Sequence, residues 1–296
     1  MLINNVYFKV YLLNQKTMSM TFLNIKNYLF IISVLFLLSS CGGNKVEDAD
    51  DTDDETSGAK LDSQKISAQN VFNALPSRTE IINLTTKTKA EYNAAVLNDP
   101  NNVNKYTIEV SRALNLGVYG ADLNVTNVFD QTQESMLFLK CVNVLAKNLG
   151  VSTAFDEKMV NRMEANKENR DSTMEIISQS FKNADTYLKA NGRPGTSALI
   201  VAGAWIEGIY IACQTAKETK SEEVVKEIFS QTESLKYLIE LLIASKLSVD
   251  SDYIIADLKS IQALCIAKID AHYTLEALKE IDAQITGLRT KVISFK

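Results

Sequence analysis

An acid in an apolar setting is the clearest residue that could carry chemistry. Between Ala198 and Cys213 the only charged residue is Glu207, so we expect its side chain to be buried. Burial raises the pKa of a carboxyl group unless a cation or hydrogen-bond donors stabilise its charge, and an acid perturbed in this way is a candidate for a functional site. A structural ion pair or a hydrogen bond to a neighbouring helix perturbs an acid equally well, and we favour that interpretation.

The segment Ala113–Leu123 carries Gly117 and Gly120 inside a helical pattern. Each glycine costs a helix about 1 kcal/mol relative to alanine, so something must offset that cost. We favour close helix–helix packing, with the central helix described below as one candidate neighbour. The functional alternative is a small-molecule pocket lined by Tyr119, Asp122, Glu207 and Trp205.

The remaining reactive side chains point to no known chemistry. His272 is the only histidine, which makes a serine–histidine–acid triad a poor interpretation, and no GxSxG motif accompanies it. Cys141, Cys213 and Cys265 each lie in an apolar helical setting, where free cysteine behaves as a small buried hydrophobe. We expect three buried thiols; one disulfide with one leftover thiol is the alternative. The spacing of metal ligands is absent, so we expect neither a metal nor a cofactor.

The elements that position these residues are predicted to be helices. Residues 61–296 show no sustained alternation typical of a half-buried strand, whereas helix signals recur. We therefore predict one domain with an all-α fold, an antiparallel multi-helix bundle of about eight or nine helices. Capping boxes predict helix starts at Ser77, Thr153, Ser172 and Thr219. Glycine C-caps predict helix ends before Gly150 and Gly192.

One of these helices should be central. The predicted helix 196–217 is apolar on all sides, which is typical of a helix buried on all sides, and it is too short and too interrupted by Glu207 for a membrane span. The last predicted region is either one helix or two that meet near His272. The expected ranges are 63–75, 77–97, 103–129, 131–149, 156–167, 172–190, 196–217, 221–246 and 251–294.

Residues 1–40 have the pattern of a secretory signal peptide. They hold three basic residues and no acidic ones, and an apolar stretch from Tyr28 to Leu38 is broken only by Ser33. This stretch is shorter than the roughly 20 apolar residues of a membrane-spanning helix. A basic flank before a short apolar run is typical of a signal peptide. Met20 opens a complete signal by itself, so it is an alternative start.

The residues Leu38-Ser39-Ser40-Cys41 that follow resemble the lipobox read by bacterial lipoprotein-processing enzymes. The resemblance implies cleavage before Cys41 and lipidation of that cysteine, with palmitate among the acyl chains. The alternative is an uncleaved N-terminal anchor with an incidental cysteine. Since several acyl chains hold a protein on a membrane stably, we expect the membrane to be a partner.

Residues 41–60 are predicted to be a disordered acidic tether. Seven acidic residues fall between Glu47 and Glu55 with almost nothing apolar, so this segment cannot repay its ordering entropy. Residues 61–296 carry 26 basic and 29 acidic residues, a net charge of −3. Because no basic face stands out, we expect no nucleic-acid partner. Acidic residues after the lipidated cysteine also resemble the surface-export signal of Bacteroidetes lipoproteins, and a plain solvated spacer is the alternative.

Several short motifs together are similar to a family of uncharacterised all-helical lipoproteins of Bacteroidetes. They are Leu75-Pro76-Ser77 with Glu80, Tyr92 with Leu97-Asn98, the Ala113–Asp122 segment, and Trp205-Ile206-Glu207-Gly208. The resemblance spans most of residues 70–215 and implies a helical fold but no activity. We expect an outer-membrane lipoprotein, facing the periplasm or the surface, that serves as a non-catalytic binding or accessory module with an envelope protein as partner. The alternatives are the small-molecule pocket and a carboxylate-based envelope hydrolase.

Overall fold

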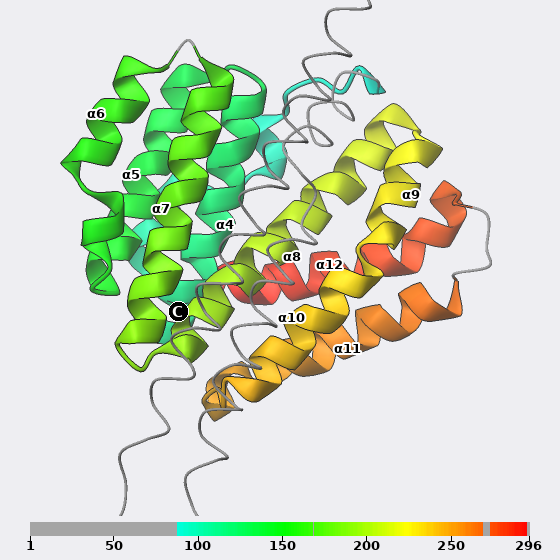
Figure 1. Cartoon of the computed structure of the whole chain (residues 1–296). Coiled ribbons are helices and arrows are strands. Elements are labelled where there is room, and N and C mark those ends of the chain that lie inside the picture. Colours follow the sequence, from blue (N-terminus) through cyan, green and yellow to red (C-terminus); the bar gives the residue numbers. More distant parts are fainter. Residues whose placement is uncertain (1–87, 168, 269–272, 295–296) are drawn as a thin grey trace, which may run out of the picture. The chain divides into compact units, whose positions relative to one another are not determined.

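The computed structural model describes residues 88–167, 169–268 and 273–294, which all belong to one compact unit. These residues form nine α-helices and four short 3₁₀ helices, with no strand among them, so the predicted all-α bundle is confirmed (Figure 1). The helices are α4 (Glu109–Val128), α5 (Thr132–Asn148), α6 (Glu157–Ala165), α7 (Arg170–Ala190), α8 (Pro194–Thr219), α9 (Glu222–Ser230), α10 (Thr232–Ala244), α11 (Asp252–Ala267) and α12 (Leu275–Ser294).

Helix α8 is the central helix that the sequence predicts. It contacts α4 and α7, which precede it in the chain, and α9, α10 and α12, which follow it (Figure 1). Pro194 opens the helix, where its missing amide hydrogen costs nothing. By length and composition alone α8 is also the one helix of the described segments that could cross a membrane, but 72% of its most apolar window is buried inside the protein. A core helix passes the same test, and that is the role α8 has here.

Helices α4 and α8 pack backbone against backbone. A Cβ added at Gly117 would lie under 3.0 Å from the carbonyl oxygen of Ile200, and one added at Gly203 would lie under 3.0 Å from that of Leu114. Gly120 instead faces the ring of Phe181 on α7. The expectation that the glycines of this segment serve helix packing is therefore confirmed, and Gly203 is the matching glycine that the sequence analysis did not single out.

These two helices run in the same direction. Glu109 near the start of α4 accepts a hydrogen bond from Thr196 near the start of α8, and further along both helices Leu114 lies against Gly203. The pair is an exception to the antiparallel arrangement expected of the bundle. It is accommodated because three helices intervene in the chain between α4 and α8.

The N-terminal boundaries of this region differ from the prediction. Within the predicted helix 77–97, the described residues 89–97 are not α-helical, and only Ala94–Val96 form a 3₁₀ turn. Helix α4 begins at Glu109 rather than near Val103. We call residues 93–106 the strap. Its main chain bonds to buried side chains of the bundle instead of completing a helix of its own, as described below, so tertiary contacts override local helix propensity.

The predicted helix 221–246 is two helices in the structure, α9 and α10, which break at Gln231. The hydroxyls of Ser230 and Thr232 donate to the carbonyls of Glu227 and Phe229, both at 2.7 Å. Such side-chain bonds compete with the regular helical ladder. The predicted region 251–294 is also two helices, α11 and α12, and His272 at their junction lies outside the described residues.

Capping boxes located the helix starts only approximately. The residues that cap α6, α7 and α9 are Asp156, Asn169 and Ser221, each with a side-chain oxygen that accepts an amide. The predictions Thr153, Ser172 and Thr219 are therefore wrong by two or three residues. Because aspartate, asparagine and serine cap equally well, neighbouring polar residues compete for the role. The C-cap predictions are confirmed, since Gly150 and Gly192 both have positive φ.

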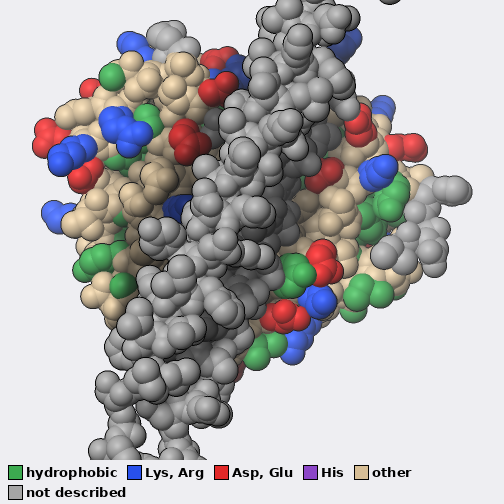
Figure 2. Space-filling model, viewed as in Figure 1, with side chains coloured by type: hydrophobic (Ala, Val, Ile, Leu, Met, Phe, Trp, Pro, Cys, Tyr) green, Lys and Arg blue, Asp and Glu red, His purple; other side chains and the backbone are tan. Residues whose placement is uncertain are grey.

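Charged side chains of both signs are interspersed on the visible face of the described residues (Figure 2). This mixture fits the near-neutral charge of residues 61–296.

Candidate functional site

Glu207 on α8 is paired with Arg289 on α12 in the interior of the bundle. Its side chain is 0% exposed, and its two carboxylate oxygens accept hydrogen bonds from Arg289 Nε and Nη2, both at 2.7 Å. The guanidinium also lies over the ring of Tyr210, 4.1 Å from its centroid. Such a bidentate, stacked arginine is held in a single orientation. The structural ion pair that the sequence analysis favoured is therefore present.

A second carboxyl group, that of Asp122 on α4, lies against Glu207. Asp122 is also 0% exposed, and its Oδ2 accepts the amide of Asn98 at 3.2 Å. Its Oδ1 has no donor among the described residues, and the side chains of Asp122 and Glu207 lie close enough to interact. Two carboxyl groups at this range repel each other when both are ionised, and they form a hydrogen bond when one carries a proton.

The proton belongs on Asp122. Burial raises the pKa of Asp122 well above its usual range, and the negative charge of Glu207 raises it further. Burial also raises the pKa of Glu207, but the hydrogen bonds and charge of Arg289 oppose that shift. Burial alone would lower the pKa of Arg289, and its bonds to Glu207 outweigh this and raise it. One carboxylate, one guanidinium and one neutral carboxyl leave the buried cluster without net charge, which is the arrangement that burial favours.

Tyr119 joins this cluster through the strap. Its hydroxyl donates to the carbonyl of Asp99 at 2.9 Å, and its ring packs edge-on against that of Tyr106, with 6.2 Å between centroids. Tyr119 is fully buried, and burial raises its pKa. The hydroxyl of Tyr106 in turn donates to the carbonyl of Ile293 on α12 at 3.3 Å. The strap therefore closes over the buried groups.

Trp205, the fourth residue of the predicted pocket, lies elsewhere. Its indole nitrogen donates to Ser234 on α10 at 3.3 Å, and its ring belongs to the hydrophobic core. The structure thus brings Glu207, Asp122 and Tyr119 into one neighbourhood and leaves Trp205 outside it.

Arg289, the cation of the cluster, was not predicted from the sequence. A signal was available, because Arg289 falls four residues after Ile285 and three before Val292, on the apolar stripe of its helix. An arginine on a buried stripe needs an acid partner. Glu207, the only charged residue between Ala198 and Cys213, was the acid available to pair with it.

Cys141, Cys213 and Cys265 are free and buried, as expected. Burial raises the pKa of Cys141 and Cys265 to about 11 each, and it also raises that of Cys213. These thiols are protonated at neutral pH and poorly nucleophilic.

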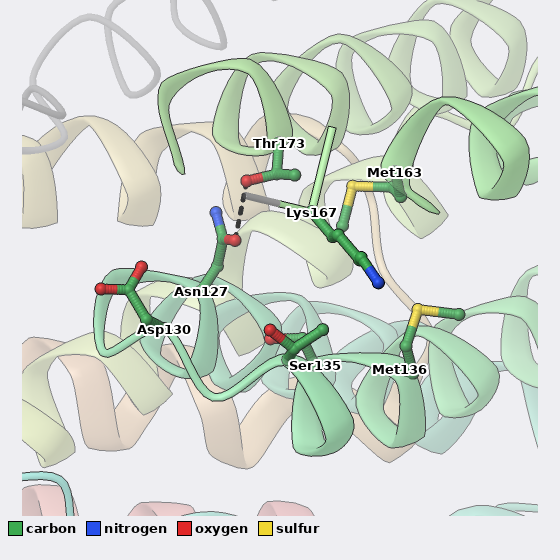
Figure 3. Close-up of a pocket in the computed structure, with 8 residues that line it drawn as sticks. Asn127, Asp130, Ser135, Met136, Met163, Lys167 and Thr173 are labelled. Atoms are coloured by element: carbon green, nitrogen blue, oxygen red, sulfur yellow. Dashed lines mark hydrogen bonds between the residues drawn. The ribbon is translucent and has the colours of Figure 1, made fainter. Parts of the chain in front are cut away.

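A small cavity lies apart from the carboxyl pair, where α4, α5, α6 and α7 meet (Figure 3). Its volume of about 20 Å³ suits roughly one water molecule. Asn127 accepts a hydrogen bond from Thr173 at 2.7 Å beside it, and Asp130 pairs with Arg170. The lining consists of Asn127, Asp130, Thr132, Ser135, Met136, Met163, Lys167 and Thr173, and includes none of the four residues of the predicted pocket.

Within the described part of the chain, no cluster of three histidine, cysteine or acidic side chains has the geometry to hold a metal ion. No protein-family model matches the chain, and no curated protein or solved structure is detectably similar to it.

Proposed function

We propose that this protein is a lipid-anchored envelope protein whose helical body serves as a non-catalytic binding or accessory module. The anchor is supported by the order of features in the sequence, in which a basic flank and a short apolar run precede Leu38-Ser39-Ser40-Cys41. An outer-membrane location, facing the periplasm or the surface, and the resemblance to helical lipoproteins of Bacteroidetes belong to the same proposal.

The proposal that the protein is non-catalytic is supported by the bonds and the burial of Glu207 and Asp122, the two acids whose pKa is raised. Both oxygens of Glu207 are bonded to Arg289, and Glu207 and Asp122 are completely buried under the strap. A catalytic acid must reach the reacting atoms of a substrate. These acids instead bind one another, an arginine and the main chain of the protein.

Two alternative functions would use the same residues. A carboxylate-based hydrolase needs two acids that converge across a cleft; Asp122 and Glu207 do converge, but in the interior. A small-molecule pocket needs Glu207, Tyr119 and Asp122 to face a ligand. Native mass spectrometry of the purified mature protein tests the pocket, because a stoichiometric retained small molecule would favour it over the binding-module proposal.

The anchor is tested by metabolic labelling with an acyl-chain probe in the native host. We expect label and detergent-phase partitioning for the wild-type protein and loss of both for Cys41→Ala, with Ser40→Ala as the matched control that keeps the cysteine. Equal labelling of Cys41→Ala and wild type would refute acylation of this cysteine. Protease treatment of intact cells then distinguishes a surface-facing body from a periplasmic one.

The accessory role is tested by cross-linking in native envelopes, followed by purification in gentle detergent and mass spectrometry. A stoichiometric protein partner is the expected result. A protein that purifies without any partner would contradict it.

A further inference from the structure

The turn that joins α7 to α8 contains the one Asn-Gly pair of the sequence, Asn191-Gly192. Asn191 is the C-cap of α7, and Gly192 follows it in the left-handed conformation, with a φ of +70°. The amide of Gly192 donates to the carbonyl of Lys189 at 3.2 Å, and that of Arg193 donates to the carbonyl of Leu188 at 2.8 Å. These are the two bonds of a Schellman motif, which favours glycine because glycine has no Cβ. The fold therefore explains the glycine, whatever residue precedes it.

An asparagine followed by glycine is also a chemically labile pair. A base removes the proton of the glycine amide, and the main-chain nitrogen attacks the carbonyl carbon of the asparagine side chain. A succinimide ring closes, and the side-chain nitrogen takes up a proton and leaves as ammonia. Water then opens the ring at either carbonyl, which yields aspartate or isoaspartate. No oxidant or reductant is needed, and a glycine at the attacking position has no side chain to obstruct the approach.

Both reacting groups of the α7–α8 turn lie at the surface. Asn191 and Gly192 are exposed, and a Cβ added at Gly192 would meet no atom within 4 Å, so the ring and the water both have room. Two hydrogen bonds must open before the attack. They join the Asn191 side-chain nitrogen to the carbonyl of Tyr187 (2.7 Å) and the Gly192 amide to the carbonyl of Lys189. Both belong to the last turn of α7, and helix ends open at a lower free-energy cost than the core.

Two other helix ends carry one half of this arrangement each. Asn166 is the C-cap of α6, with φ and ψ of −115° and 14° against −100° and 21° at Asn191, and its side-chain nitrogen likewise donates to the carbonyl four residues earlier, at 2.8 Å. Lys167 follows it instead of glycine. Helix α5 ends in the same Schellman turn as α7, but there Leu149 precedes the glycine, Gly150. The turn after α7 combines the two halves.

We propose that Asn191 is a site of spontaneous deamidation in the folded protein. The product places a carboxylate at the C-terminal end of α7, where the helix dipole disfavours negative charge. In the isoaspartate form the main chain gains a methylene group, which displaces the two amides of the Schellman motif from their carbonyls. Arg193, two residues further on, binds Glu109 on α4 and the carbonyl of Leu149 at the end of α5, both at 2.7 Å. The modification therefore acts where the ends of several helices are tied together.

Peptide mapping by mass spectrometry tests this after the purified mature protein has been incubated at mildly alkaline pH. Aspartate and isoaspartate should accumulate at Asn191 at least about tenfold faster than at Asn166, a ratio that corresponds to about 1.4 kcal/mol in activation free energy. Asn191→Leu copies the end of α5 and should abolish the product in this turn. Lys167→Gly creates a second Asn-Gly pair and should raise the rate at Asn166. Equal rates at Asn191 and Asn166 in the wild type would overturn the inference.

A second variant separates local opening from reaction of the unfolded chain. Gly203→Ala crowds the α4–α8 contact and raises the unfolded fraction without touching the α7–α8 turn. If Asn191 reacts through opening of the last turn of α7, its rate in Gly203→Ala should equal that in the wild type. A rate that rises in proportion to the unfolded fraction would mean that the folded protein protects Asn191, and the inference would be wrong.

Discussion

Helices α4 and α8 meet in two different ways within a short distance along their axes. At Gly117 and Gly203 the two backbones touch without side chains between them. A little more than one turn further on, Asp122 meets Glu207 through buried carboxyl groups, with Arg289 as the counter-charge. The first contact requires that glycine has no side chain. The second requires a proton on one carboxyl group and the positive charge of Arg289.

The two contacts therefore differ in how their stability depends on pH and on substitutions. A backbone contact has no titratable group, so it is indifferent to pH and intolerant of added volume. A buried polar cluster tolerates an isosteric exchange but not the loss of one partner, because the remaining charge or donor then lies uncompensated in the interior. Four predictions sharpen this contrast.

The largest effect is expected at Glu207. Glu207→Gln leaves Arg289 buried without its carboxylate, and we expect a loss of about 3–5 kcal/mol in the free energy of unfolding, measured by urea denaturation. The double variant Glu207→Leu with Arg289→Met replaces both partners by apolar groups and should recover most of that loss. A melting temperature unchanged by Glu207→Gln would show that the ion pair is not structural, and would favour the ligand pocket.

The next effect is expected at the glycine contact. Gly203→Ala forces a Cβ against the backbone of α4, so the helices must separate, at a cost of about 1–3 kcal/mol. Gly208→Ala, on the same helix, meets nothing within 4 Å and should stabilise the protein by about 0.5–1 kcal/mol through helix propensity. Chemical denaturation of both variants side by side decides the point. Equal effects of the two substitutions would mean that the α4–α8 approach is not tight.

The third prediction concerns the proton on Asp122. Because its pKa is raised in the folded state, the unfolded chain releases this proton above the ordinary pKa of 3.8 while the folded protein retains it. The contribution of Asp122 is therefore greatest at low pH and shrinks as the pH rises, by up to about 1.4 kcal/mol per unit. The other titratable groups that interact with it are Glu207, Arg289, Tyr119, Cys141 and Tyr92.

Asp122→Asn isolates this effect. The asparagine amide can donate to Glu207 and its oxygen can accept the amide of Asn98, as the protonated acid does. The stability of Asp122→Asn relative to the wild type should increase between about pH 5 and pH 7, the range in which the acid loses its proton on unfolding. A difference that stays constant with pH would place a carboxylate, not a carboxylic acid, at Asp122.

The smallest effect is expected at an exposed ion pair. Lys291 on α12 contacts Asp257 on α11 at 2.7 Å, but the lysine side chain is 55% exposed. Lys291→Ala should cost about 0.2–1 kcal/mol, and less in high salt, because water and ions screen exposed charges. A loss as large as that of Glu207→Gln would remove the contrast between buried and exposed pairs. Thermal melts at two salt concentrations measure it.

Much of the fold follows from periodicity and composition, because each helix needs an apolar face and α8 is apolar on every face. Only one half of the buried ion pair could be predicted from the sequence. Glu207 could be located because it interrupts an apolar run, but its partner lies 82 residues away in the chain, and pairing over that separation depends on tertiary structure. The strap was not predicted, since its main chain bonds to side chains of α4 and α12, and these contacts depend on tertiary structure.

Trp205 gives the molecule a built-in optical probe. It is the only tryptophan in the chain, and its indole is buried and hydrogen-bonded to Ser234 on α10. Its fluorescence therefore reports one place, the packing of α8 against α10, and shifts to the red when water reaches the ring. Its one hydrogen bond joins α8 to α10, so a urea or thermal transition followed by this emission monitors the loss of that packing without an added label.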